Sequence, residues 1–155
     1  AGLVRLGGAL MAFGNRVDGS FARLVQGKEA PKSIVWGDFD RSALVRLPVV
    51  AATKDGRPVA PPTVEFRLPD GSALPHLLLA GVSQAMVAGK RTPDVAALLE
   101  RTSARNPSSI SEMGNRVPWN SIEVADALIA HRYVLEDGGV FPTALIGRLV
   151  EQIRS

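Results

Sequence analysis

Residues 37–48 read GDFDRSALVRLP, and the alternation of apolar and charged side chains in their second half is typical of a strand. The alternating run extends from 43 to 50 and carries Arg46 in its middle. Because successive side chains of a strand point to opposite faces, Val45 and Leu47 share one face and Arg46 lies on the other. We therefore expect a strand that buries one face and presents a charge on the opposite one.

A second strand of the same kind is predicted further along the chain, where residues 63–68 read TVEFRL. Its apolar side chains point one way, and Glu65 and Arg67 point the other. The segment TKDGRP (53–58) contains a turn signal that suits a hairpin connection between the two strands. If the two strands are neighbours, Arg46, Glu65 and Arg67 converge on one surface.

The pattern alone leaves two interpretations of this charged surface. The first is an ordinary solvated sheet face with a cross-strand ion pair, worth about 0.2–1 kcal/mol. The second is an anion site, in which the arginines hold a phosphate or carboxylate and the glutamate holds a metal ion. The spacing of the residues does not decide between them.

The rest of the chain predicts one short strand before this pair and mainly helices after it. The strand covers 33–36, and helical spacing of apolar residues predicts helices over 2–13, 74–88 and 143–153. Thr92 and Asn120 are expected to cap two further helices, and 101–118 reads as a polar loop. The order predicts an α+β fold with an antiparallel sheet, whose apolar face is covered by the helix 74–88 and whose other face is polar.

Composition limits the class of protein. The 155 residues include 46% apolar residues and no cysteine, which fits one globular domain in a reducing, cytoplasmic setting. No apolar run approaches the roughly 20 residues of a membrane span, and the net charge of +3 is spread out without a basic stripe, so neither membrane nor nucleic-acid binding is expected. The chain starts at Ala1 without a methionine, so it is either processed or a piece of something longer.

Four stretches, taken together, resemble the glutamine synthetase family. GNRVDGSFARLVQGKEAP (14–31) is similar to the family segment N-P-x-x-N-S-Y-x-R-L-x-P-G-x-E-A-P, and GDFDRSALVRLP to x-x-x-N-R-S-A-x-I-R-x-P. VEFRLPDGSALPHLLLA (64–80) is similar to V-E-x-R-x-P-D-x-x-x-N-P-Y-L-x-x-A, and VPWNSIEVADALIAHRYVLED (117–137) to L-P-x-S-L-x-E-A-L-x-x-L-x-x-D. By this resemblance, residues 1–155 form a single partial domain, the C-terminal part of a glutamine synthetase catalytic domain.

The resemblance implies an ATP-dependent carboxylate–amine ligase. The family joins ammonia or another amine to the γ-carboxylate of glutamate through a γ-glutamyl phosphate, using ATP with Mg²⁺ or Mn²⁺, and forms homo-oligomers. Carried over by position, six side chains acquire expected roles. They are Arg23 for the glutamate carboxylate, Glu29 as the flap glutamate that helps deprotonate ammonium, Arg41 on the phosphate side, Arg46 for the nucleotide phosphates, Glu65 for a metal ion, and Arg67 for substrate carboxylate or transferred phosphate.

The sequence also departs from the family pattern. Asp40 replaces the asparagine before Arg41, and Leu74 and His76 replace the polar residues of N-P-Y-L. The family's further glutamates and its histidine precede these motifs and are not in this chain. We therefore expect the isolated chain to be catalytically incompetent, and a degenerate, non-catalytic binding or assembly module is the alternative.

Overall fold

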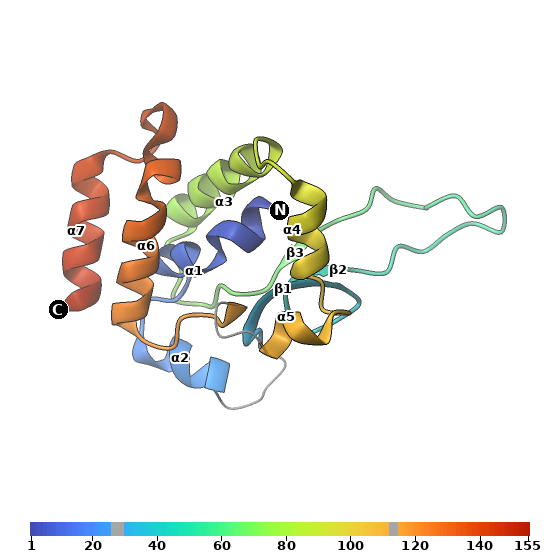
Figure 1. Cartoon of the computed structure of the whole chain (residues 1–155), viewed down its shortest axis with the longest axis horizontal. Helices are drawn as coiled ribbons and strands as arrows, with labels where there is room; N and C mark the ends of the chain where they lie inside the picture. Colours follow the sequence, from blue (N-terminus) through green and yellow to red (C-terminus); the bar gives the residue numbers. More distant parts are fainter. Residues whose placement is uncertain (26–29, 112–114) are drawn as a thin grey trace.

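The structure is a computed structural model that describes residues 1–25, 30–111 and 115–155. Two helices are followed by three strands that form a small sheet, and the rest of the described chain is helical (Figure 1), so the predicted α+β class is confirmed. The elements are α1 (Gly2–Gly14), α2 (Asp18–Val25), β1 (Ser33–Asp38), β2 (Ala43–Leu47), β3 (Glu65–Phe66), α3 (Pro75–Lys90), α4 (Val95–Arg101), α5 (Pro107–Ser111), α6 (Ser121–Glu136), a 3-10 turn (Asp137–Gly139) and α7 (Thr143–Arg154).

The three strands lie in the order β1-β2-β3, and only one of the two pairs is antiparallel. β2 and β3 pair as predicted, but β1 and β2 run parallel, which corrects the expectation of an antiparallel sheet. Parallel neighbours normally need a connection of a dozen or more residues. Here only residues 39–42 separate the two strands, and we call them the return segment.

Two local features allow this short return segment. Phe39 adopts a φ of +61°, in a region that residues other than glycine rarely occupy, and this reverses the chain direction. Asp40 then accepts hydrogen bonds through Oδ1 from the backbone N–H of Ser42 at 2.8 Å and from its hydroxyl at 2.7 Å. This turn returns the chain to the start of β2.

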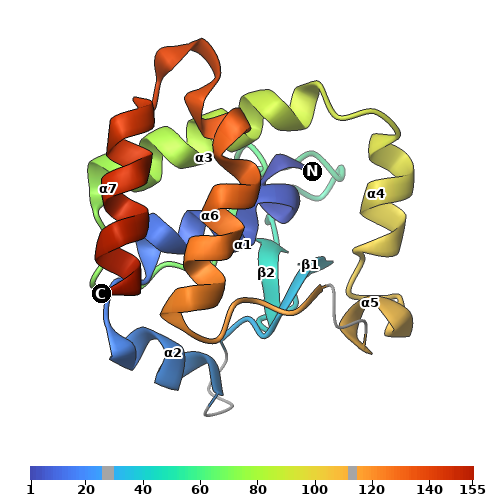
Figure 2. The ribbon, with the colours of Figure 1, turned by 60° about the vertical axis from the view of Figure 1, so that its left-hand side comes forward.

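The core is built around α1, which packs against α3, α6, β1 and β2. α1 lies at the centre of Figure 1, and Figure 2 shows α6 and α7 side by side in front of it. The helix that covers the sheet is therefore α1, whereas 74–88 was expected there and α3 instead packs mainly on α1. Gly7 permits this close contact, because a Cβ there would lie 2.5 Å from Cδ2 of the buried Leu44.

Residues 48–64, between β2 and β3, form an arm that projects from the body (Figure 1). The predicted turn closes its tip: the N–H of Thr53 donates to the carbonyl of Arg57 at 2.8 Å, and Gly56 has a φ of +81°. The flanking strands are shorter than predicted, ending at Leu47 and beginning at Glu65.

Of the two predicted helix caps, Asn120 is confirmed and Thr92 is not. The N–H of Glu123 donates to Oδ1 of Asn120 at 2.8 Å, as expected for a helix start. Thr92 does not cap α4; its hydroxyl donates to the carbonyl of Ala88 at 3.0 Å, at the end of α3. In the part of the chain described, no helix combines the length and the apolar character needed to cross a bilayer.

Candidate functional site

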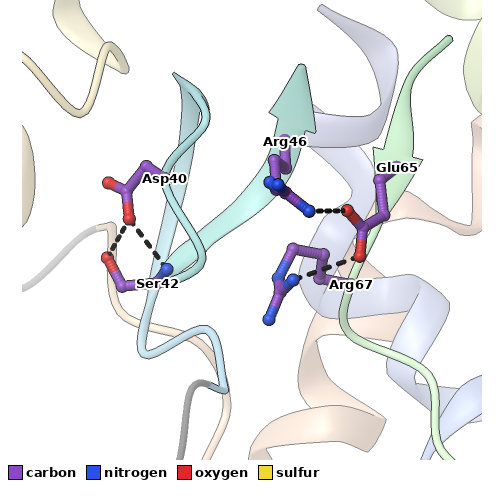
Figure 3. A network of polar contacts seen from close by, with 5 residues as sticks. All are labelled: Asp40, Ser42, Arg46, Glu65 and Arg67. Carbon is purple, nitrogen blue, oxygen red and sulfur yellow. Dashed lines mark hydrogen bonds and ion pairs between the residues drawn. The ribbon is translucent and has the colours of Figure 1, made fainter. Parts of the chain in front are cut away.

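The charged residues predicted to share one face of the sheet do lie together. Arg46 of β2 is directly opposite Glu65 of β3 in the antiparallel register. Nη1 of Arg46 lies 2.8 Å from Oε2 of Glu65, and Nη1 of Arg67 lies 3.1 Å from Oε1 (Figure 3). We call these three residues the charged cluster.

The charged cluster is half-buried and carries a net positive charge. The side chains of Arg46 and Arg67 are 21% and 14% exposed, and that of Glu65 is 40% exposed. The buried Nε of Arg46 has no hydrogen-bond partner among the described residues. Because one carboxylate is shared by two guanidinium groups, the cluster has the charge and N–H donors to bind an additional anion.

Arg67 is held in place by the backbone on both sides of it. Its N–H donates to the carbonyl of Leu44 at 3.0 Å, which extends the contact between the β3 segment and β2. The next residue, Leu68, is fully buried. The carbonyl of Leu68 accepts from Nη2 of Arg23 at 2.6 Å and from Nδ2 of Asn15 at 3.0 Å. The structure thus brings Arg23 of α2 to the residue that follows Arg67.

Asp70 closes this region with a dense set of hydrogen bonds. Its Oδ1 accepts from the hydroxyl of Ser72 at 2.6 Å and from the N–H of the same residue at 2.8 Å, and its Oδ2 accepts from Nδ2 of Asn15 at 3.2 Å. Burial raises the pKa of Asp70, but hydrogen bonds from Ser20, Ser72 and Asn15 outweigh it, so the pKa is below its ordinary value. Asp70 therefore remains ionised near neutral pH.

The remaining predicted residues are placed differently. Arg41 lies in the return segment before β2 with an exposed side chain, whereas Arg46 is the next-to-last residue of that strand. The carboxylate of Asp40, which could have opposed a phosphate, is instead engaged by Ser42 (Figure 3). Glu29 lies outside the described residues, so its expected role stays a prediction.

The described residues do not by themselves fit a divalent metal ion. Both oxygens of Glu65 accept N–H groups, and no group of three or more His, Cys, Asp or Glu side chains within the described ranges could hold a metal. Nδ1 of His131 lies 3.1 Å from the carbonyl oxygen of Ala127 in its own helix. A metal at Glu65 would need ligands from elsewhere.

Pattern analysis missed Asn15, Ser20 and Asp70, which connect the α1–α2 junction to the end of β3. The available signal was the pair of D-G-S triplets at 18–20 and 70–72, which are typical of turns that use side-chain hydrogen bonds. Their meeting in space depends on long-range packing, which the triplets do not encode.

Comparison with known proteins agrees on one class. The family model described as "Glutamine synthetase, catalytic domain" matches residues 1–152. The chain is 34% identical over 154 residues to a glutamine synthetase of Frankia alni, covering 99% of this chain and 31% of the relative. It is 32% identical over 146 residues to one of Mycobacterium tuberculosis, covering 94% of this chain and 30% of the relative.

A solved structure has the same fold. The cryoEM structure of Plasmodium falciparum glutamine synthetase matches with a TM-score of 0.75 at 23% identity, over 99% of this chain and 36% of that one. The family model and the two relatives define the class as that of glutamine synthetase catalytic domains, and the solved structure shows that the fold is the same. The chain belongs to the glutamine synthetase family, in its catalytic domain, and spans about a third of the length of the relatives it matches.

Proposed function

We propose that this chain is a portion of an ATP-dependent carboxylate–amine ligase that joins glutamate to ammonia or a larger amine. In the proposed reaction, the γ-carboxylate of glutamate attacks the γ-phosphorus of ATP and releases ADP. The amine then displaces phosphate from the γ-glutamyl phosphate. The observation that carries the proposal is the charged cluster of Arg46, Glu65 and Arg67, in a chain that belongs to this family.

The chemistry explains why arginines are suited to this surface. Phosphoryl transfer depends mainly on positioning and on stabilising negative charge at the phosphate oxygens. Arg46 would contact the nucleotide phosphates, Arg41 the transferred phosphate, and Arg67 the substrate carboxylate or the transferred phosphate. Arg23 donates to the carbonyl of Leu68, the residue that follows Arg67, and would hold a carboxylate of glutamate. Glu29 would complete the site as a base when it closes over the amine.

We further propose that this chain does not catalyse the reaction alone. Glu65 would serve as one ligand of Mg²⁺ or Mn²⁺, which neutralises phosphate charge when bound, and the remaining ligands would come from outside this chain. The proposed working form is a homo-oligomer in the cytoplasm. The alternative is a degenerate, non-catalytic binding or assembly module, which the replacement of polar residues by Leu74 and by His76 favours.

The test is the binding of ATP to the purified chain at low salt, measured by calorimetry. We expect Arg46→Ala to weaken binding by about tenfold, because charge-assisted bonds to phosphate are worth roughly 1.5–3 kcal/mol. Arg57→Ala, in the exposed arm, is the matched control and should leave the affinity unchanged. Equal affinities of wild type and Arg46→Ala would show that the cluster is not the nucleotide site. Glutamine formation by the chain alone would overturn the proposed inactivity.

A further inference from the structure

Asn15 occupies the junction between α1 and α2 and is almost fully buried, at 4% exposure. Its two amide hydrogens point to two different groups, the carbonyl of Leu68 at 3.0 Å and Oδ2 of Asp70 at 3.2 Å. Both of these groups only accept hydrogen bonds, the carboxylate because it is ionised. The amide orientation is therefore fixed, since a flipped amide would place its oxygen against two acceptors.

The opposite end of this amide is not satisfied. Oδ1 of Asn15 is buried without a hydrogen-bond partner among the described residues. Leaving a buried acceptor unpaired is costly, and a smaller or apolar side chain would avoid that cost. The two donated bonds are thus what the side chain contributes at this position.

Those bonds end on the backbone that carries the charged cluster. The carbonyl of Leu68 also accepts from Nη2 of Arg23 at 2.6 Å, so Asn15 and Arg23 share one acceptor. Leu68 follows Arg67 directly, and the N–H of Arg67 donates to the carbonyl of Leu44. Moving the carbonyl of Leu68 would therefore move Arg23 and Arg67 together, while Arg46 lies on a different strand.

The surrounding bonds make this junction rigid. The N–H of Asp70 donates to the carbonyl of Gly14 at 3.0 Å, and the N–H of Arg16 donates to the hydroxyl of Ser72 at 2.8 Å. The residues on each side of Asn15 are thus joined to the segment that follows β3. A side chain placed between two such fixed segments sets the distance between them.

We infer that Asn15 is a positioning residue for the carboxylate subsite: through the carbonyl of Leu68 and through Asp70 it sets the spacing of Arg23 and Arg67 for a substrate carboxylate. This inference rests on the function proposed above. It assigns Asn15 no contact with substrate. Its effect should be largest at the two arginines that it locates and smaller at Arg46, which meets Arg67 only through Glu65.

The experiment follows the side-chain Nε–H signals of Arg23, Arg67 and Arg46 by NMR in the full chain, with binding of glutamate and of ATP measured in parallel. In Asn15→Ala we expect the signals of Arg23 and Arg67 to shift more than that of Arg46, which meets Arg67 only through Glu65. Glutamate affinity should fall about tenfold, which is the lower end of the roughly 10–100-fold loss seen when a group that orients a binding residue is removed. ATP affinity should change by less than about twofold.

A second variant removes the bond to Leu68 and keeps a bond between positions 15 and 70. The exchange N15D/D70N restores a carboxylate–amide pair between the two positions, but a carboxylate at position 15 cannot donate to the carbonyl of Leu68. We expect it to show Arg23 signals shifted from those of the wild type, at a cost in stability, because the buried carboxylate at position 15 faces the carbonyl of Leu68. It also serves as the test if Asn15→Ala does not fold.

Two results would overturn the inference: unshifted Arg23 signals in Asn15→Ala, or wild-type Arg23 signals in N15D/D70N. Equal loss of glutamate and ATP affinity would also overturn it, because general loosening would then explain the effect. If the wild-type chain binds no glutamate, the proposed substrate fails on its own, and the arginine signals still decide whether Asn15 positions these side chains.

Discussion

Glu65 lies between two guanidinium groups, and each of its carboxylate oxygens accepts an N–H from one of them. In Glu65→Gln the shared negative charge is lost and Arg46 and Arg67 repel each other across the half-buried face. We expect the free energy of unfolding to fall by about 1 kcal/mol at low salt, and by less at high salt, as is typical of partly exposed ion pairs. Urea denaturation at two salt concentrations measures this.

The matched control for this change is Glu151→Gln on α7. Glu151 is exposed and forms no ion pair with a described residue, so its loss should change stability much less. An equal effect of the two variants, or a loss at Glu65 that does not depend on salt, would show that the carboxylate does not screen the two arginines.

Asp70 gives the fold a dependence on acid. Its pKa is lowered on folding, so it contributes stability that is present above the ordinary carboxyl pKa of about 3.9 and is lost as the pH falls through the lower folded value. Asp70→Asn should be less stable than wild type at neutral pH, and the difference should shrink progressively below about pH 4. Urea midpoints measured from neutral to acid pH test this.

Glu123 provides the comparison for this prediction. Its pKa is also lowered, chiefly by its hydrogen bond with Arg116. Burial raises the pKa, and further hydrogen bonds from the N–H of Trp119 and the amide of Asn120 lower it. The stability of Asp70→Asn should therefore still fall somewhat in acid. In the double variant with Glu123→Gln, stability should change even less with pH. A wild-type acid profile in Asp70→Asn would show that its hydrogen bonds contribute no pH-dependent stability.

At the scale of elements, the contact between α1 and α3 depends on a glycine. A Cβ at Gly81 would lie 2.7 Å from Cδ2 of Leu10 and 3.0 Å from Cε2 of Phe13, and both of those side chains are buried. We expect Gly81→Ala to destabilise the fold by about 1–2 kcal/mol, because overpacking exceeds the gain of up to about 1 kcal/mol in helix propensity. Thermal unfolding measures the change.

Gly147 in α7 is the control, because the same substitution there should raise the stability of the fold. Nothing lies within 4 Å of a Cβ built there, so Gly147→Ala adds helix propensity without a clash. We expect it to stabilise the fold by up to about 1 kcal/mol. Stabilisation by both substitutions would mean that Leu10 and Phe13 can move aside and that α1 and α3 are not closely packed at Gly81.

The elements differ in how well the sequence predicts them, for physical reasons. α3, α6 and α7 begin within about two residues of their predicted positions, because apolar periodicity and caps are local properties. The parallel pairing of β1 with β2 depends on the positive φ of Phe39, and nothing in the residue pattern required it. α5 forms within a segment that reads as a polar loop.

The same distinction applies to the candidate site. Strand alternation was sufficient to predict that Arg46, Glu65 and Arg67 share a face, because the period of a strand fixes side-chain direction. The meeting of Arg23 with the carbonyl of Leu68 could not be predicted, since it joins residues 45 positions apart through tertiary packing. The bond from Asn15 to the same carbonyl spans 53 positions and was missed for the same reason.

At the scale of the whole molecule, the arm is separate from the packed body. Its backbone hydrogen bonds include those from Val59 to Ala51 and from Thr53 to Arg57, all within the arm, and the side chain of Arg57 is 85% exposed. Val49, Val59 and Val64 are also largely exposed. The fold of the body should therefore not depend on an intact arm.

Limited trypsin digestion tests this separation. We expect cleavage after Lys54 before cleavage at Arg46 or Arg67, because a protease requires an accessible, locally open backbone and the latter two side chains are mostly buried beside paired strands. Arg57 is followed by Pro58, so trypsin does not cut there. The two products should remain associated, since β2 and β3 stay paired and α1 holds both parts of the core. Mass spectrometry locates the cuts, and size-exclusion chromatography shows whether the fragments separate.

The control for the cleavage is Lys54→Gln, which removes the trypsin site of the arm and should delay the first cut. After cleavage of wild type, we expect a lower unfolding temperature but a cooperative transition, because the nick removes a chain connection and no core contact. Early cleavage at Arg46, or separation of the fragments under native conditions, would mean that the arm is needed to hold β3 against β2. The charged cluster, which bridges those two strands, would then be formed only in the uncut chain.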